Sequence, residues 1–373
     1  MRLNGLKIMK LFGIDIYIDY SWFLIFALIT WLLAAKFYPT FNHNASVLSN
    51  VLLALATSIL FFLSILIHEL AHSVVSKRNG LEVNKITLFI FGGIAELFEE
   101  PHDAIMEFKI AISGPIASLL LALIYLSIYY LVKDNTHYYS ITLLTSTLAE
   151  INLLLFIFNL LPGFPLDGGR ILRSIVWRIN GNLKNSTRIA TIGGRVVAVA
   201  IILIGVIRVI TTDFFGGVWL MLIGLFLYQA AGQSYLELLI RLALEKVKVK
   251  EIMNTNIVFV NPLLSVNDLI EEYFLKYNYT TLPVIANDTI VGIVSLDDVR
   301  DKSGYLDDST KVQEVMKRFD SNIFLNKDDQ ALKALKNMIL NKVNFVSIRE
   351  QGRLVGVLTI DDIARYLSDK KVI

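Results

Sequence analysis

Long runs of apolar residues fill the first 235 positions of the chain, whereas the remainder mixes apolar and charged residues as soluble domains do. About 20 consecutive apolar residues suffice to cross a bilayer as a helix. The pattern predicts a membrane domain (residues 1–236), a linker (237–248) and a soluble domain (249–373). We expect about six spanning helices, at residues 20–35, 47–75, 108–132, 141–161, 189–210 and 217–235.

Two stretches of the membrane domain have the pattern of strands. Residues 14–19 alternate isoleucine with polar residues or tyrosine, which is the period of a strand. Residues 81–98 are rich in β-branched residues and are interrupted by Gly92-Gly93, which predicts a strand or hairpin. Non-helical backbone at membrane depth must pair or line a cavity. This second element is therefore either an edge to which an extended peptide could add as a strand, or a plain connecting hairpin.

Basic residues are distributed unequally between the two sides of the expected spans. The opposite loops hold two, Lys36 and Lys133. Positive residues concentrate on the cytoplasmic side of membrane proteins, so both termini and the soluble domain are expected in the cytoplasm. The twelve residues on the richer side are Arg2, Lys7, Lys10, Lys77, Arg78, Lys85, Lys109, Arg170, Arg173, Arg178, Lys184 and Arg188.

Composition limits the class of protein and the kinds of metal site that the chain can form. A hydrophobic fraction of 55% and a mean hydropathy of +0.58 exceed those of an ordinary soluble protein. A net charge of +2 gives no sign of a nucleic-acid partner. The chain has no cysteine, so disulfides and thiolate metal sites are excluded, and any metal must be held by histidines and carboxylates.

The second expected span ends in the signature His68-Glu69-Leu70-Ala71-His72. On a helix, His68 and His72 lie one turn apart on one face, so both imidazoles can reach one metal ion. Glu69 is rotated by roughly 100° and is better placed to deprotonate a water than to ligate. The alternative is a chance meeting in a packed helix, but the chain has five histidines in all, and ionisable groups are costly in a membrane.

The fourth expected span ends in a stretch that contains two prolines and three glycines, residues 159–170. Its prolines and glycines break the helix and leave Asp167 on a tight turn. Asp167 is either a turn or N-cap residue of the next helix, or the third ligand that the histidine pair lacks.

The soluble domain repeats itself. Residues 249–253 match 312–316 with an offset of 63, and residues 291–299 match 355–363 with an offset of 64. Two short units of this kind (249–305 and 312–373) are expected to bury their faces together as one pseudo-symmetric α/β domain. Each unit ends in a strand, a hydroxyl residue and an aspartate three positions on. These residues either cap a helix or line a nucleotide cleft.

Taken together, four features resemble the site-2 protease family of intramembrane zinc metalloproteases. They are the histidine signature within a span, Gly92-Gly93 after a strand, Gly114-Pro115 in the next span, and the stretch Asn159 to Gly169. The terminal repeat is similar to a tandem pair of CBS (cystathionine-β-synthase) domains. Ser118 departs from the family pattern, in which many members carry asparagine three residues after Gly-Pro.

The resemblance implies a polytopic α-helical membrane domain with a short β element, followed by a soluble CBS pair. It implies one Zn²⁺ per chain held by His68, His72 and Asp167, with Glu69 as general base and Asn159 polarising the scissile carbonyl or holding the oxyanion. The substrate class is a transmembrane protein, such as an anti-sigma factor or another membrane-tethered regulator. ATP, ADP or AMP is the expected regulatory ligand, and the CBS pair makes a homodimer plausible. The nucleotide candidates are Ser295, Asp298, Thr359 and Asp362.

Two other classes of function compete with a protease. A transport protein regulated by a CBS pair would need a polar pathway across the bilayer, and the ionisable residues gather on one side. A catalytically inactive relative that only binds membrane partners would be expected to lose the base or a ligand, whereas Glu69, both histidines and Asp167 are present.

Overall fold

The computed structural model describes the protein as two compact units, Met1–Tyr235 and Leu236–Ile373. Each is considered by itself. The residues described are 5–41, 46–90, 92–97, 101–255, 258–276, 281–286, 289–301, 310–318, 324–341, 343–350 and 353–372.

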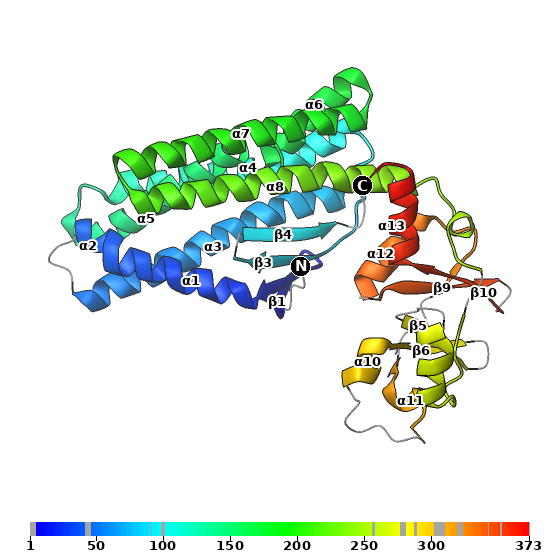
Figure 1. Ribbon diagram of the computed structural model, residues 1–373. Helices are drawn as coiled ribbons and strands as arrows, with labels where there is room; N and C mark the ends of the chain where they lie inside the picture. The colour runs from blue at the N-terminus through cyan, green and yellow to red at the C-terminus, as the bar shows by residue number, and fades with distance from the viewer. Residues whose placement is uncertain are drawn as a thin grey trace. The chain divides into compact units, whose positions relative to one another are not determined.

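The first unit is built from long helices (Figure 1), and six helices among the described residues are apolar and long enough to cross a membrane. This confirms the predicted polytopic architecture. The helices are α1 (Tyr20–Leu32, continued through η1, Leu33–Phe37, and α2, Tyr38–Phe41), α3 (Val47–Arg78), α4 (Ala104–Val132), α5 (Tyr139–Asn159, after η2, Thr136–Tyr138), α6 (Asp167–Asn180), α7 (Leu183–Thr211) and α8 (Phe214–Leu244). α6 is the shorter, amphipathic helix of the set.

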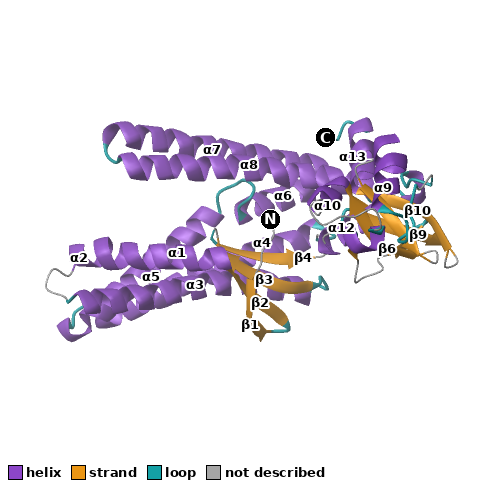
Figure 2. Cartoon of the chain, turned by 60° about the horizontal axis from the view of Figure 1, so that its bottom comes forward, coloured by secondary structure: helices purple, strands orange, loops and turns teal. Residues whose placement is uncertain are grey.

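Polar caps extend several helices beyond their apolar runs. Asp103 accepts a hydrogen bond from the Met106 backbone N–H (2.9 Å) and starts α4 four residues earlier than the apolar pattern indicates. At 32 residues, α3 is about 48 Å long, which exceeds the roughly 30 Å core of a bilayer. α4 packs against α3, α5 and α6. α7 and α8 run side by side in both views, with Gly205 against Gly217 (Figures 1 and 2).

A four-stranded sheet lies beside α1 and α3 in the order β1-β2-β3-β4 (Figure 2). Its strands are β1 (Gly5–Leu11), β2 (Ile14–Asp19), β3 (Val83–Phe89) and β4 (Gly92–Leu97). Both stretches predicted as β are strands, and the parallel pairing of β2 with β3 joins them in one sheet. Ile14, Ile16 and Ile86 pack on Leu66 and Leu70 of α3, on either side of His68. The sheet therefore supports the part of α3 that carries the histidine signature.

In the described part of the second unit, the strands form two three-stranded sheets, β5-β6-β7 and β10-β9-β8. Its elements are η3 (Val249–Glu251), α9 (Val266–Asp268), η4 (Leu269–Leu275), β5 (Thr281–Ala286), β6 (Thr289–Ser295), α10 (Leu296–Asp301), α11 (Val312–Val315), β7 (Lys317–Arg318), β8 (Phe324–Asn326), α12 (Ala331–Asn341), β9 (Phe345–Glu350), β10 (Arg353–Thr359) and α13 (Ile360–Asp369). Residues 237–244, within the expected linker, continue α8 as helix.

The two repeats exchange their leading segments. Val249 of the first repeat is buried in the apolar core of the second, and its N–H donates to the Asp329 carbonyl (2.8 Å). Val312 of the second repeat is buried in the core of the first, and its N–H donates to the Leu264 carbonyl (2.9 Å). Neither repeat can complete its core alone, so the pair forms one domain.

Candidate metal centre

α3 presents His68 and His72 on one face, with their Nε2 atoms 3.2 Å apart. Both side chains are buried, at 4% and 7% exposure. The one-turn spacing predicted from the signature is therefore realised on an unbroken helix.

Asp167 completes a three-residue cluster from a different helix. It is the first residue of α6, and its Oδ2 lies 3.0 Å from His68 Nε2 and 3.2 Å from His72 Nε2. The N-cap of α6 is Leu166, so the Asp167 side chain faces the histidines rather than capping its own helix. Among the described residues, these three form a group of His and Asp whose ligand atoms all lie within 4.8 Å.

Groups of α4 contact the Nδ1 atoms of both histidines. His72 Nδ1 lies 2.7 Å from the Ile110 carbonyl oxygen, and a carbonyl can only accept, so Nδ1 carries the proton. His68 Nδ1 lies 2.8 Å from the buried Ser118 hydroxyl. With Nδ1 protonated, the His72 imidazole turns its Nε2 lone pair toward the Asp167 carboxylate. The His68 imidazole does the same in the tautomer in which its Nδ1 donates to the Ser118 hydroxyl. Three acceptor atoms this close repel one another unless a cation lies between them, so the donor set fits a metal ion such as Zn²⁺.

Sequence reasoning missed the role of Ser118, which it treated as a departure from the family pattern. The structure places its hydroxyl on the His68 ring, where a short side chain reaches Nδ1. The position of Ser118 four residues after Gly114, one turn along α4, is the signal that could have found it. The Ile110 carbonyl carries no sequence signal, because any residue supplies one.

Two glycines let neighbouring backbone approach the cluster. A Cβ on Gly114 of α4 would lie 2.1 Å from His72 Nε2 and 2.6 Å from His68 Nε2. A Cβ on Gly93 of β4 would lie 2.4 Å from Glu69 Cγ. The signature glutamate is therefore covered by β4, on the side of α3 that faces the sheet.

Asn159 is the last residue of α5 and is partly exposed. The segment between it and Asp167 folds into a tight turn containing a cis peptide bond between Phe164 and Pro165. Gly168 packs against the Leu160 and Leu161 carbonyls, which fixes the start of α6 close to the end of α5.

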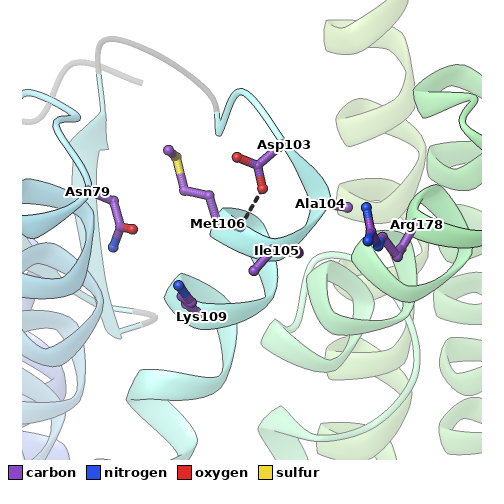
Figure 3. Close-up of a pocket in the computed structure, with 7 residues that line it drawn as sticks. All are labelled: Asn79, Asp103, Ala104, Ile105, Met106, Lys109 and Arg178. Carbon is purple, nitrogen blue, oxygen red and sulfur yellow. Dashed lines mark hydrogen bonds between the residues drawn. The ribbon is translucent and has the colours of Figure 1, made fainter.

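A cavity of about 270 Å³ is lined by residues from the ends of α3, α4 and α6 (Figure 3). Lys109 and Arg178 line it with apolar groups. The Asp103 carboxylate at its rim is engaged by the Met106 N–H, as the dashed line shows. None of the predicted site residues lines this cavity.

The candidate nucleotide residues lie at the starts of two helices in the second unit. Thr359 caps α13 and exchanges hydrogen bonds with Asp362: the Thr359 N–H and hydroxyl donate to Asp362 Oδ2 (3.0 and 2.7 Å). This is the capping interpretation considered from sequence. Ser295 ends β6 immediately before α10. The side chain of Asp298 lies outside the described residues.

Comparison with known proteins supports the resemblance. Residues 56–205 match the model of peptidase family M50, and residues 249–304 and 305–369 match the CBS domain. Zinc metalloprotease MJ0392 of Methanocaldococcus jannaschii is 31% identical over 323 residues, covering 87% of this chain and 88% of that one. The Rip3 protein of Mycobacterium tuberculosis is 30% identical over 366 residues, covering 98% of this chain and 93% of its own length.

Among solved structures, a site-2 protease from Methanocaldococcus jannaschii is 30% identical and covers 62% of this chain and 95% of that one, with a TM-score of 0.44. The CBS domain of a bacterial CNNM/CorC family Mg²⁺ transporter is 23% identical, covers 36% of this chain and 97% of that one, and has a TM-score of 0.32.

Proposed function

The chain belongs to peptidase family M50, as a zinc metalloprotease of the site-2 type, and we propose that it hydrolyses a peptide bond within or near a transmembrane helix of a membrane-tethered protein. The six apolar helices found among its described residues make it a multi-pass integral membrane protein. The observation that carries the proposal is the convergence of His68, His72 and Asp167, because that donor set suits a catalytic Zn²⁺ with an open fourth position.

The candidate site residues would have three different roles in peptide hydrolysis. His68, His72 and Asp167 would hold one zinc ion, which supplies a Lewis acid able to activate water near neutral pH. Glu69 would take the proton from the attacking water and return it to the leaving amine. Asn159, at the end of α5, would donate its side-chain amide to the scissile carbonyl as negative charge develops there.

The sheet suggests how a substrate is held. β4 pairs with β3 on one side, and no strand among the described residues pairs with its other side. Gly93 brings this strand against Glu69. A transmembrane helix that unwinds locally could add to β4 as an extended strand, which would present a peptide bond beside the general base.

The distribution of basic residues supports an orientation with both termini and the CBS pair in the cytoplasm. The metal centre would then lie below the cytoplasmic surface. Measured along the axis of α3, His72 lies about 8 Å and His68 about 14 Å from Lys77. A membrane-tethered cytoplasmic regulator, such as an anti-sigma factor, fits this position.

The CBS pair would regulate cleavage by binding ATP, ADP or AMP. The candidate contacts are Ser295 and Asp298 in the first repeat, and Thr359 and Asp362 in the second. Although Asp362 Oδ2 already accepts from Thr359, a carboxylate has about four lone-pair directions, so ribose hydroxyls could still donate to it. Homodimerisation through the CBS pair is part of the same proposal.

Zinc analysis of the purified full-length protein, wild type beside Asp167→Ala, tests the metal centre without knowledge of the substrate. We expect about one zinc per wild-type chain and clear loss in the variant, because two protein ligands remain. Glu69→Gln should keep zinc and lose cleavage of a single-pass transmembrane test protein. A wild type that stays metal-free when zinc is supplied would overturn the protease proposal. Titration with adenine nucleotides, followed by calorimetry, tests the regulatory part separately.

A further inference from the structure

A buried ion pair joins α4 to α6 outside the metal cluster. Glu107, in the first turn of α4, is fully buried, and Arg173 of α6 is 7% exposed. Arg173 Nε donates to Glu107 Oε1 at 2.6 Å, and its Nη2 contacts the same oxygen. Burying two charges carries a desolvation cost that apolar side chains of similar volume would avoid. The pair is therefore more readily explained by the geometry that it fixes than by stability.

The two partners sit on the helices that supply the groups around the histidines. On α4, Glu107 lies one turn before Ile110, whose carbonyl engages His72. On α6, Arg173 follows Asp167 by six residues, about 9 Å along the helix. A shift of α6 against α4 would change the distance from the Asp167 carboxylate to both histidine rings.

Arg173 also contacts the turn that leads into α6. Its guanidinium carbon lies 5.1 Å from the centre of the Phe164 ring. Phe164 is itself buried against Ala190 and Ala231, in α7 and α8. One guanidinium thus joins α4, α6 and the turn before Asp167. A planar guanidinium can make these contacts together, whereas an ammonium group acts as a single point of charge.

We propose that Glu107 and Arg173 are positioning residues that set the distance between Asp167 and the two histidines, so that zinc affinity depends on an ion pair that does not touch the metal. This inference rests on the zinc site proposed above. Removing a hydrogen-bond partner of a metal ligand typically changes metal affinity by 10- to 100-fold. Glu107 and Arg173 do not contact the ligands directly, so their effect is expected at the lower end of that range. We expect a loss of about tenfold from either single substitution.

The test measures zinc affinity of the full-length protein in detergent, by competition with a chromogenic chelator, and the visible absorption of the Co²⁺-substituted protein. The variants are Arg173→Met, Glu107→Gln and the double variant. The matched control is Arg178→Met, the same substitution on an exposed residue of the same helix. Arg173→Lys, which keeps the charge, should lose less affinity than Arg173→Met and also serves if the latter does not fold.

We expect weaker zinc binding and an altered Co²⁺ spectrum in both single variants and no change in Arg178→Met. The double variant should bind no more weakly than the worse single variant, because each change breaks the same interaction. Single variants that unfold at lower temperature yet keep wild-type affinity and the wild-type spectrum would show that the pair serves stability alone and would overturn the inference. Fully additive losses would also overturn it. A wild type without zinc affinity would instead overturn the proposed metal site, and this inference with it.

Discussion

Gly114→Ala tests the placement of the metal centre with a single methyl group. The added Cβ would lie 2.1 Å from His72 Nε2 and 2.6 Å from His68 Nε2. Zinc–nitrogen bonds are about 2.0–2.1 Å long, so the methyl would lie at a zinc–nitrogen distance from His72 Nε2 and about half an ångström further from His68 Nε2. The substitution is therefore expected to compete directly with the metal for space.

The magnitude follows from these distances. A carbon atom and a ring nitrogen do not approach within about 3 Å, so at least one imidazole must move by roughly 1 Å. Zinc sites tolerate about 0.2 Å in ligand distance, so a displacement of this size removes a ligand rather than weakening it. We expect loss of zinc by at least about 100-fold in affinity. The substitution should not weaken the helix itself, because alanine is more favourable than glycine in a helix interior by about 1 kcal/mol.

The assay is zinc content and chelator competition on wild type and variant, with thermal unfolding of the metal-free forms beside it. Gly232→Ala in α8 is the matched control. It is also a helical glycine, and the nearest heavy atom to its added Cβ is the flexible tip of Arg195, at 3.1 Å. The control should bind zinc as the wild type does. A Gly114→Ala protein that binds one zinc with wild-type affinity would refute the placement of α4 against the histidines.

Three further predictions concern single groups. Gly93→Ala should keep zinc but reduce cleavage at least tenfold, because its Cβ would displace Glu69 Cγ, 2.4 Å away, and leave the metal ligands in place. A loss of zinc equal to the loss of cleavage would contradict this. Ser118→Ala should weaken zinc binding by about 10-fold, measured by chelator competition, since His68 Nδ1 loses its partner at 2.8 Å, and unchanged affinity would argue against that contact. Thr359→Ala should cost about 1 kcal/mol of unfolding free energy in the CBS pair through loss of the α13 cap, whereas Thr359→Ser should retain most of it; chemical denaturation distinguishes the two.

The sequence determined those features that depend on neighbours along the chain. Apolar runs long enough for a bilayer predicted all six spans, because a helix in lipid must be continuous and apolar. The four-residue spacing of His68 and His72 fixed their common face on α3 for the same local reason. The internal repeat predicted one α/β domain, since two similar short units need each other's surfaces.

Tertiary packing decided which groups from other elements lie against the two histidines. It brought the Asp167 carboxylate to within 3.0 Å of His68 Nε2 and 3.2 Å of His72 Nε2, across 95 or more residues of chain. It supplied the Ser118 hydroxyl and the Ile110 carbonyl, and it paired β2 with β3. A carbonyl, a glycine without a Cβ and a serine are common in any helix, so their functional value arises from what lies opposite them. The sequence by itself indicated the candidate metal ligands, and only the packing of α3, α4 and α6 determined the geometry in which they meet.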